Sequence, residues 1–337
     1  MSQTSAAGPN LDGMVLVEGL TFLMGSDAHY PEEKPAHRVA VDSFHIDETT
    51  VTNEQFRRFV EETDYLTVAE RPVDPANYPG VPPEKLVPSS LVFTPPQRPV
   101  DLRDFRNWWS YLAGANWRQP EGPGSSIEGR GEHPVVHVAF EDATAYADWC
   151  GKSLPTEAQW ELAARGGLEG KAFAWGDTFM PNGQLMAKVW QGNFPWKNLF
   201  PAGLEWTAPV RSFPANGYGL HEMTGNVWEW TLDWYSPRHL NGPKTTASDS
   251  AASGSAGSSP CCVPFNPRGG PEEQSYDPAV PQVRIPRKVI KGGSFLCAEN
   301  YCMRYRPAAR FPEAVDSATS HLGFRCVVNL PVSPSKA

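Results

Sequence analysis

Two of the six cysteines in this 337-residue sequence, Cys297 and Cys302, lie five positions apart and are the residues best suited to do chemistry. A thiolate is a strong nucleophile and a soft metal ligand, and nearby cations favour thiolate over thiol. Arg304 and Arg306 follow the second cysteine, and Lys291 precedes the first. The segment therefore predicts redox or metal chemistry at a pair of activated sulfurs.

The spacing of this pair dictates how the chain must bring it together. An offset of five places two side chains on opposite faces of a strand and well off a common face of a helix. A turn is needed, and Glu299 and Asn300 are residues typical of turns. Three interpretations stay open: a short-loop disulfide, half of a zinc site, or a two-thiolate site for Cu(I). No His-x3-His follows, and two soft thiolates suit Cu(I) better than Zn²⁺, which prefers four ligands.

A second group of residues offers hard oxygen ligands at close spacing. The carboxylates of Glu222 and Glu229, with the backbone carbonyls of Gly225 and Val227, form a set that suits Ca²⁺. The alternative is a solvated acidic turn with no metal.

Composition limits the class of protein. The sequence holds 34 Pro, 29 Gly and 12 Trp, which indicates irregular loops packed around large aromatic side chains. A formal charge of −9 and the lack of a Lys/Arg block argue against a nucleic-acid surface. There is no leader-like segment and no run of eighteen apolar residues, so we expect a cytoplasmic protein with no membrane contact. A small molecule or another protein is the expected partner.

Local patterns predict several of the elements that must position these residues. Two capping boxes, at Thr52 and Thr156, predict helices that end near Glu62 and at Gly166. A further amphipathic helix is expected over 141–150. Expected strands are 14–17, 22–25 and 39–46 as a hairpin with a third strand, then 135–138, 288–293 and 323–330, the last as a closing central strand.

The segment 65–130 carries Pro and Gly throughout and is expected to form an irregular rim of a cleft. Trp108, Trp109, Trp117 and Arg118 are candidates to contact an extended peptide there. Packing into a loop-rich core is an equally good explanation for the three tryptophans.

Several longer motifs resemble the formylglycine-generating enzymes, also called sulfatase-modifying factors. The motifs are G-A-N-W-R-Q-P-E-G-P (114–123), G-K-S-L-P-T-E-A-Q-W-E (151–161), G-Y-G-L-H-E-M-T-G-N-V-W-E-W (217–230), G-G-S-F-L-C-A-E-N-Y-C-M-R-Y-R (292–306) and S-H-L-G-F-R-C (320–326). They run in order, so the resemblance covers nearly the whole chain.

This resemblance implies a fold and an activity. The fold would be a single α+β domain over 13–330, related to C-type lectins and poor in regular structure, with a lead-in at 1–12 and a tail at 331–337. The activity would be a copper-dependent oxidation, with O₂ and a thiol reductant, of the cysteine in a Cys-x-Pro-x-Arg segment of sulfatases to Cα-formylglycine. Two alternatives share the scaffold: an iron-dependent sulfoxide synthase and a non-catalytic, lectin-like binding module.

The resemblance also assigns site residues. Cys297 and Cys302 would hold Cu(I), Ser294 and Tyr301 would position substrate and oxygen, and Trp228 would wall the oxygen pocket. His321 stands where many members have Asn.

For metals, the resemblance implies one structural Ca²⁺ on Glu222, Gly225, Val227 and Glu229. A second calcium site of the family is expected to be lost, because Lys188 and Ala202 replace ligands and the Lys188 ammonium can stand in for the ion.

Two further expectations concern the other cysteines and the substrate. A bridge between Cys150 and Cys326 is compatible with the family pattern, and Cys261 and Cys262, after a Ser/Ala/Gly-rich loop, are free thiols or a vicinal pair. The arginine of the substrate needs an acidic partner, for which Asp101 and Asp104 on the expected rim are the first candidates.

Overall fold

The computed structural model describes residues 9–201, 203–239 and 263–331, and its centre is a four-stranded sheet. The strands run in the order β11-β10-β9-β12. Strands β9, β10 and β11 are antiparallel, whereas β12 is parallel to β9. Their bounds are Trp228–Trp234 (β9), Arg287–Lys291 (β10), Arg310–Ala314 (β11) and Leu322–Gly323 (β12). The segment between β10 and β11 carries both Cys297 and Cys302, so the sheet anchors the cysteine segment at both ends.

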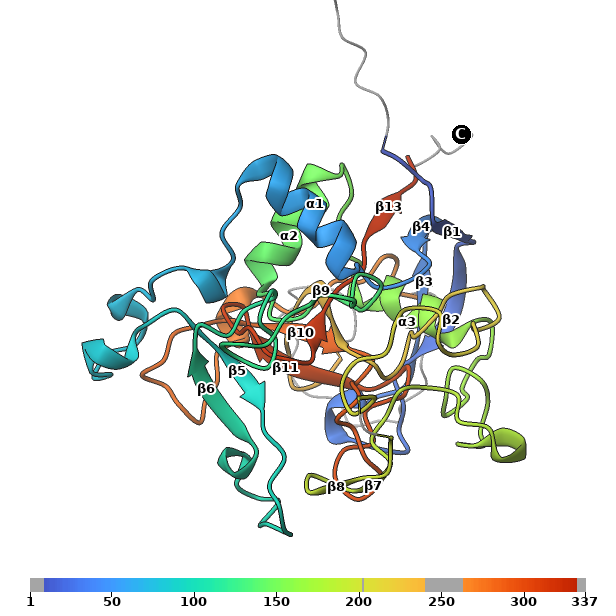
Figure 1. Cartoon of the computed structure of the whole chain (residues 1–337). Coiled ribbons are helices and arrows are strands. Elements are labelled where there is room, and N and C mark those ends of the chain that lie inside the picture. Colours follow the sequence, from blue (N-terminus) through green and yellow to red (C-terminus); the bar gives the residue numbers. More distant parts are fainter. Residues whose placement is uncertain (1–8, 202, 240–262, 332–337) are drawn as a thin grey trace, which may run out of the picture.

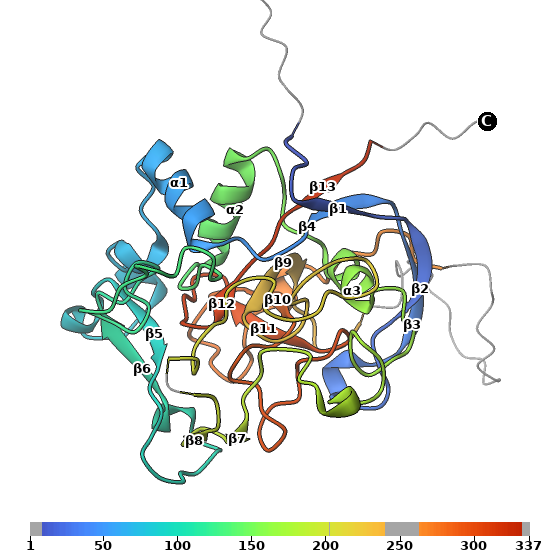
Figure 2. The ribbon, with the colours of Figure 1, turned by 45° about the vertical axis from the view of Figure 1, so that its right-hand side comes forward.

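Within the described residues four smaller sheets lie around this centre (Figure 1), one of which is formed by residues 89–93 and 109–113. Strand β4 (Phe44–Asp47) lies between β1 (Met14–Val17) and β13 (Val327–Asn329), and Figure 2 shows these strands of the two chain ends side by side. Strand β2 (Leu20–Met24) pairs with β3 (His37–Val41), and β7 (Gly192–Asn193) pairs with β8 (Lys197–Asn198). No helix in the described residues is long and apolar enough to cross a membrane.

The predicted N-terminal hairpin is wrong, because β1 and β2 belong to different sheets. The third predicted strand, 39–46, also divides into β3 and β4 at Asp42 and Ser43. Both breaks meet at Gly19, where an added Cβ would lie 2.6 Å from the backbone nitrogen of Ser43. The Gly19 N–H donates to the Ser43 hydroxyl at 2.8 Å. The segments that contain Gly19 and Ser43 therefore cross at this glycine, so that β1 pairs with β4 on one side of the crossing and β2 pairs with β3 on the other.

The two helices with capping boxes are confirmed. Helix α1 is Asn53–Thr63 and α3 is Glu157–Arg165, and in each the N-cap threonine and a glutamine exchange hydrogen bonds. Helix α3 ends at Gly166, whose φ of +54° is the left-handed conformation that glycine adopts readily. The third predicted helix forms as α2, Phe140–Trp149, and packs beside α1 in Figure 1.

The expected structureless rim at 65–130 contains a hairpin of its own. Strands β5 (Ser89–Phe93) and β6 (Trp109–Ala113) pair in antiparallel register, and short 3-10 turns η2 to η5 connect the rest. Hydrogen bonds between Leu91 and residues 318 and 320 attach β5 to the loop that follows β11. Trp108 and Trp117 are fully buried and belong to the core, which leaves only Trp109 partly exposed.

Two other predicted strands differ from the structure. Residues 135–138 form no strand, and only an isolated bridge joins Pro134 to Thr52. The closing strand 323–330 divides into β12 and β13, which lie at the edges of two different sheets. The break lies at Arg325, whose side chain is fully buried against Glu229 of β9. The run 323–330 is apolar enough to form one continuous strand, but the buried ion pair between Arg325 and Glu229 interrupts it.

Candidate active site

The cysteine segment leaves β10 through two glycines and folds back on itself. Gly292 and Gly293 both have positive φ, and a Cβ on Gly293 would lie 2.9 Å from the backbone of Arg304. The backbone N–H groups of Tyr301 and Cys302 donate to the carbonyl of Ala298 at 3.0 and 2.7 Å. The turn that the spacing of the two cysteines requires is therefore present.

This turn places the sulfurs of Cys297 and Cys302 3.3 Å apart. A disulfide bond is about 2.0 Å long, so these are two free thiols in contact. Cys297 is buried in the apolar core cluster that also contains Trp228, whereas Cys302 is half-buried at the margin of this cluster. One sulfur is enclosed by the protein, and its partner lies closer to the surface.

The two thiols differ in their readiness to ionise. The hydrogen bond from Cys297 and the charge of Arg304, whose Nη1 lies 3.9 Å from the sulfur, lower the pKa of Cys302 to about 6. Burial, and then the neighbouring Cys302, raise the pKa of Cys297 well above its ordinary value. At neutral pH the pair is therefore one thiolate that accepts a hydrogen bond from one thiol.

Arg304 is held in place by residues from the other end of the chain. Its guanidinium pairs with Glu32 at 2.6 Å and lies 3.9 Å from the ring centre of Tyr30. The Tyr30 hydroxyl in turn accepts the backbone N–H of Met303 at 3.1 Å. Sequence analysis missed Glu32 and Tyr30, because no local pattern connects positions about 270 residues apart.

The other two cations assigned to the sulfurs are engaged elsewhere. Arg306 forms a buried bidentate pair with Glu33, and Lys291 pairs with Glu161 of α3 at 3.0 Å. These groups anchor the ends of the turn, and only Arg304 reaches a sulfur.

Ser294 and His321 form a hydrogen-bonded unit beside Cys297. The Ser294 N–H donates to the Cys297 sulfur at 3.5 Å, and the Ser294 hydroxyl lies 3.0 Å from Nδ1 of His321. The His321 ring contacts Trp109 of β6, with ring centres 4.8 Å apart. Burial lowers the pKa of His321 to about 3, so the imidazole is neutral at physiological pH. His321 therefore acts as a neutral hydrogen-bonding partner.

Tyr301 and Trp228 lie in different surroundings. Tyr301 is 41 % exposed and stacks on Phe194 with ring centres 4.5 Å apart. Trp228 is buried, contacts Phe311, and its backbone N–H donates to the His321 carbonyl at 2.8 Å. The structure thus brings together β9, the cysteine turn and residue 321, and the partly exposed Tyr301 lies near both cysteines, whose charges raise its pKa after burial.

The predicted calcium ligands already have partners within the chain. Glu229 accepts hydrogen bonds from Arg325 at 2.8 and 2.9 Å and from the Trp160 indole at 2.7 Å. Glu222 accepts the backbone N–H groups of Arg211 and Phe213 at 3.0 and 3.1 Å. Within the described residues no three His, Cys, Asp or Glu side chains gather as metal ligands. Calcium at this segment stays a prediction, and Arg325 competes with it for Glu229.

The turn that contains Gly225 and Val227 also supports the cysteine segment directly. The Gly225 N–H donates to the Gly292 carbonyl at 2.8 Å, and the Phe295 N–H donates to the Asn226 carbonyl at 2.9 Å. These bonds give the segment a structural role with or without a metal.

The Lys188 ammonium is buried, donates to the Leu204 carbonyl and lies 3.2 Å from the centre of the Phe200 ring. Burial lowers its pKa to about 8. The ammonium is thus satisfied by a carbonyl and an aromatic face, while Ala202 lies outside the described residues.

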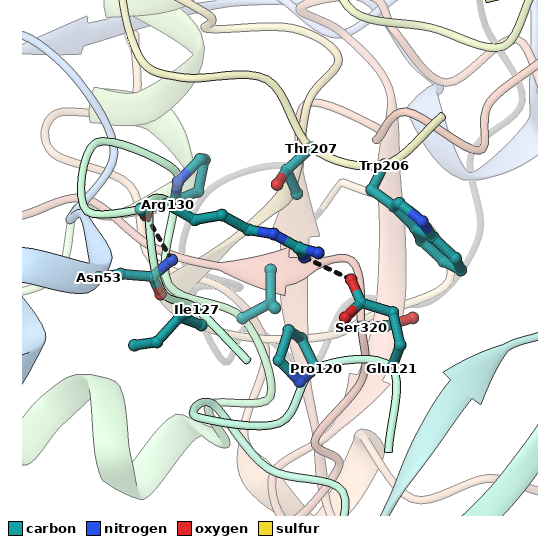
Figure 3. A pocket seen from close by; sticks show the side chains of 10 residues that line it. Asn53, Pro120, Glu121, Ile127, Arg130, Trp206, Thr207 and Ser320 are labelled. Atoms are coloured by element: carbon teal, nitrogen blue, oxygen red, sulfur yellow. Dashed lines mark hydrogen bonds and ion pairs between the residues drawn. The ribbon is translucent and has the colours of Figure 1, made fainter. Parts of the chain in front are cut away.

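Each of the two aspartates proposed for the substrate arginine pairs with an arginine two residues further on, and their role in binding stays a prediction. Asp101 pairs with Arg103 at 2.7 Å, and Asp104 pairs with Arg106 at 2.7 Å, both at the surface. A small cavity of about 20 Å³ near Ser320 is also closed, because an ion pair between Arg130 and Glu121 crosses it (Figure 3). It is too small for a peptide side chain.

Comparison with known proteins first defines the class of fold. The structure of PvdO from Pseudomonas aeruginosa superposes with a TM-score of 0.56 at 21 % identity, over 94 % of each chain. This similarity supports the expected fold, a single domain with few helices, small sheets and many loops.

Sequence comparison then identifies the family. Residues 2–330 match the sulfatase-modifying factor enzyme 1-like domain, and the chain belongs to this family. It is similar to the formylglycine-generating enzyme of Mycobacterium tuberculosis, with 49 % identity over 96 % of this chain and 99 % of that protein. It is also similar to a mouse protein named inactive C-alpha-formylglycine-generating enzyme 2, with 43 % identity over 66 % of this chain and 70 % of that protein. Overall identity therefore does not separate active from inactive members, and the site must be judged by its residues.

Proposed function

We propose that this chain oxidises the cysteine of a Cys-x-Pro-x-Arg segment in sulfatases to Cα-formylglycine, with O₂ as acceptor and a thiol as reductant. The observation that carries the proposal is the pair of unbridged cysteine sulfurs, 3.3 Å apart, with the Arg304 guanidinium beside Cys302. The names of the similar proteins support the same activity.

The proposed reaction balances with the reactants named. The substrate CH₂–SH, O₂ and two reductant thiols give the aldehyde, H₂S, water and one disulfide. The substrate Cβ–H and S–H give two electrons and two protons, and the two reductant thiols give the same, which reduces O₂ to two waters. One water equivalent then replaces the sulfur at Cβ and becomes the aldehyde oxygen, and the sulfur leaves as H₂S.

The donor set fits Cu(I). Two sulfurs from one rigid turn are soft ligands, which suit a soft monovalent ion better than Zn²⁺. When bound, Cu(I) would supply the one-electron chemistry that makes O₂ reactive toward the substrate. Cys297 and Cys302 would hold it, and the pair of thiolates that metal binding favours is stabilised by Arg304 and by the Ser294 N–H.

The other residues of the chain hold this arrangement. The Glu32 carboxylate and the Tyr30 ring fix Arg304 beside Cys302. The neutral His321 ring fixes the Ser294 hydroxyl, while Trp228 and its apolar neighbours exclude water from the side of Cys297. Substrate must then approach from the half-buried Cys302, next to the exposed Tyr301.

The two alternatives have weaker support from the site. In an iron sulfoxide synthase, histidines would have to gather as ligands, but both ring nitrogens of His137, a neighbour of His321, are engaged by Ser90 and the Pro120 carbonyl. A lectin-like module requires no activated thiolate, and a disulfide in its place is inconsistent with two separate thiols.

A titration with Cu(I) under anaerobic conditions tests the proposal. We expect one equivalent to bind and to protect two thiols from alkylation in the wild-type protein, and none in Cys297→Ser. Mass spectrometry of a Cys-x-Pro-x-Arg peptide should then show loss of sulfur and formation of the aldehyde. Normal turnover without copper would overturn the copper assignment, and an unchanged peptide would overturn the oxidase assignment.

A further inference from the structure

The loop that connects β2 to β3, residues 25–36, is tied to both ends of the cysteine segment. At the start of the segment, the first backbone N–H of the loop donates to Glu161 at 2.8 Å, and the same glutamate pairs with Lys291 at 3.0 Å. At the far end, the fully buried Glu33 of the loop forms the bidentate pair with Arg306. Residues from the N-terminal part of the chain therefore hold the segment from two sides.

Between these anchors the loop places Tyr30 against the residues that follow Cys302. The Tyr30 hydroxyl accepts the Met303 N–H at 3.1 Å, and the centre of its ring lies 3.9 Å from the Arg304 guanidinium. The Met303 nitrogen is bonded to the carbonyl carbon of Cys302, so the hydroxyl lies at most about 6 Å from the Cα atom of Cys302. One rigid phenol thus contacts both the main chain at Cys302 and the cation beside its sulfur.

Arg304 needs this support, because its carboxylate partner holds it at one point only. Its Nη2 pairs with one oxygen of Glu32, and its Nε is buried without a hydrogen-bond acceptor among the described residues. Three arginines of the core each form two hydrogen bonds with both oxygens of a glutamate, namely Arg306, Arg310 and Arg325. Two such bonds fix the plane of a guanidinium, whereas a single bond leaves it free to rotate.

Aromatic faces supply the orientation that the ion pair lacks. The Arg304 guanidinium lies 3.9 Å from the centre of the Tyr30 ring and 4.8 Å from the centre of the Phe311 ring of β11. A guanidinium stacks favourably on such faces. In this orientation its Nη1 lies 3.9 Å from the sulfur of Cys302. Phe311 is fixed in the central sheet, so the loop contributes the closer of the two rings that hold the cation at the sulfur.

We propose that Tyr30 is a positioning residue for the cysteine pair, which holds Arg304 at Cys302 with its ring and the main chain of the turn with its hydroxyl. The effect on turnover rests on the proposed function, whereas the effect on the sulfurs does not. Two thiolates and Cu(I) together carry one negative charge, which a guanidinium held in place stabilises. Loss of the ring therefore changes the charge that a reagent meets at Cys302 and weakens the binding of Cu(I).

Two alkylating reagents measure the charge at Cys302 in the protein without metal or peptide. Iodoacetate is an anion and iodoacetamide is neutral, but both react with the same thiolate, so the ratio of their rates reports the nearby cation and not the fraction of thiolate. We expect Tyr30→Leu to lower this ratio about fivefold, and Tyr30→Phe, which keeps the ring, to lower it less than twofold. Peptide mass spectrometry measures both rates at Cys302, and an unchanged ratio in Tyr30→Leu would overturn the inference.

The matched control is a second tyrosine that stacks on an arginine. Tyr276 is half-buried like Tyr30, and the Arg284 guanidinium lies 5.5 Å from the centre of its ring. Tyr276→Leu should leave the ratio of the two rates at Cys302 unchanged. An equal fall in both leucine variants would assign the effect to a general loss of structure and would also contradict the inference.

Hydrogen exchange tests the hydroxyl separately from the ring. Tyr30→Phe should speed exchange of the Met303 amide about fivefold, because it removes the acceptor of this N–H. Tyr276→Phe should leave this exchange unchanged. A Met303 amide that exchanges at the wild-type rate in Tyr30→Phe would show that the hydroxyl does not hold the turn, and the two-point contact would be wrong.

A further variant keeps the test decisive if Tyr30→Leu fails to fold. Glu32→Gln removes the charge of the carboxylate but leaves the Tyr30 ring, so we expect the ratio of iodoacetate to iodoacetamide rates to stay the same or to rise. A fall to the ratio of Arg304→Met, in which the cation is absent, would show that the ion pair alone holds Arg304. That result would overturn the role of Tyr30.

Competition with a chromophoric chelator measures the effect on Cu(I). We expect Tyr30→Leu to bind Cu(I) about fivefold more weakly than the wild-type protein, and Tyr30→Phe and Tyr276→Leu to differ from it by less than twofold. Equal affinities in all four proteins would overturn the inference for the metal.

Turnover of a Cys-x-Pro-x-Arg peptide separates this inference from the proposed function. If the wild-type protein forms no aldehyde while Tyr30→Leu lowers the alkylation ratio, the oxidase assignment fails and the role of Tyr30 stands. If aldehyde forms while the ratio is unchanged, the oxidase assignment stands and the role of Tyr30 is wrong. Where both hold, Tyr30→Leu should lower kcat about fivefold and leave KM within twofold, because Tyr30 acts through Arg304 and not on the peptide.

Discussion

In the part of the chain that the structure describes, two pairs of cysteines lie close together, and they differ more in their surroundings than in their sulfur chemistry. In the pair Cys297 and Cys302, and in the pair Cys150 and Cys326, a hydrogen bond between the thiols lowers the pKa of the less buried member. In both pairs burial raises the pKa of the other member. All four are free thiols, so the bridge between Cys150 and Cys326 is absent, and Cys261 and Cys262 lie outside the described residues.

The difference is in the charges that surround each pair. The charge that lowers the pKa of Cys302 is that of Arg304, whereas the effect of Lys152 on the pKa of Cys150 is opposed by Asp47. Asp47 pairs with Lys152 at 2.6 Å and also accepts the Cys326 N–H at 2.9 Å, so it ties β4 to the chain just before β13. Two thiols in contact therefore do not make a reactive site by themselves. Both cations pair with a carboxylate, Arg304 with Glu32 and Lys152 with Asp47, but of these two carboxylates it is Asp47 that also acts on its thiols, so the balance of charge at the sulfurs differs between the pairs.

The largest expected effect separates the two pairs by activity. Cys297→Ser and Cys302→Ser should each lower aldehyde formation by at least about a thousandfold, because the pair acts as a unit and a hydroxyl is a poor ligand for Cu(I). Cys150→Ser is the matched control and should retain activity within about threefold, since it lies outside this unit. Mass spectrometry of the peptide measures the rate of aldehyde formation. An equal loss of activity in Cys150→Ser would show that the two cysteine pairs do not differ in function.

The next effect concerns the framework around the second pair. Glu229→Gln should lower the free energy of unfolding by about 3–5 kcal/mol, because it leaves the buried Arg325 guanidinium without its charge partner. Glu48→Gln, which breaks a largely exposed pair with Arg211, should cost less than about 1 kcal/mol. Chemical denaturation measures both values.

The same variant tests calcium. If Arg325 keeps the carboxylate in the presence of Ca²⁺, the loss in Glu229→Gln will be equal with added Ca²⁺ and with a chelator. A melting temperature that rises with Ca²⁺ in the wild-type protein, but not in the variant, would instead establish the calcium site predicted at Glu222, Gly225, Val227 and Glu229.

A smaller effect tests the charge beside each pair. Removal of the cation in Arg304→Met should raise the pKa of Cys302 by about one to two pH units, because an adjacent positive charge favours the thiolate. The wild-type thiolate should be present above about pH 6 and lost below it, so alkylation should slow as the pH falls through this value. In the variant, the same decline should begin at a higher pH.

The control for this experiment lies at the second pair. Lys152→Met should leave the alkylation profile of Cys302 unchanged, since Lys152 pairs with Asp47 and does not act on Cys302. A profile of Cys302 that is identical in wild type and Arg304→Met would show that the hydrogen bond from Cys297 alone sets its pKa.

Much of the local structure was predictable from the residues, because capping boxes and glycine stops act within one turn of the chain. Helices α1 and α3 formed where Thr52, Thr156 and Gly166 predicted them. Strand pairing was not predictable to the same degree. The stretches 14–17 and 22–25 both have the right alternation for a hairpin, but the choice of partner depends on the crossing at Gly19.

At the candidate site, the sequence by itself determined the pair of cysteines, the need for a turn between them and the presence of cations nearby. Only the tertiary structure decided which cation acts on the sulfurs. Arg304, Arg306 and Lys291 each pair with a glutamate, and of the three only Arg304 also reaches a sulfur. The tertiary structure also pairs Asp101 and Asp104 with arginines two residues away, which the sequence analysis did not anticipate. Pairs between neighbouring residues form within one turn of the chain, whereas the glutamates that hold Arg304, Arg306 and Lys291 come from segments that only the fold brings together.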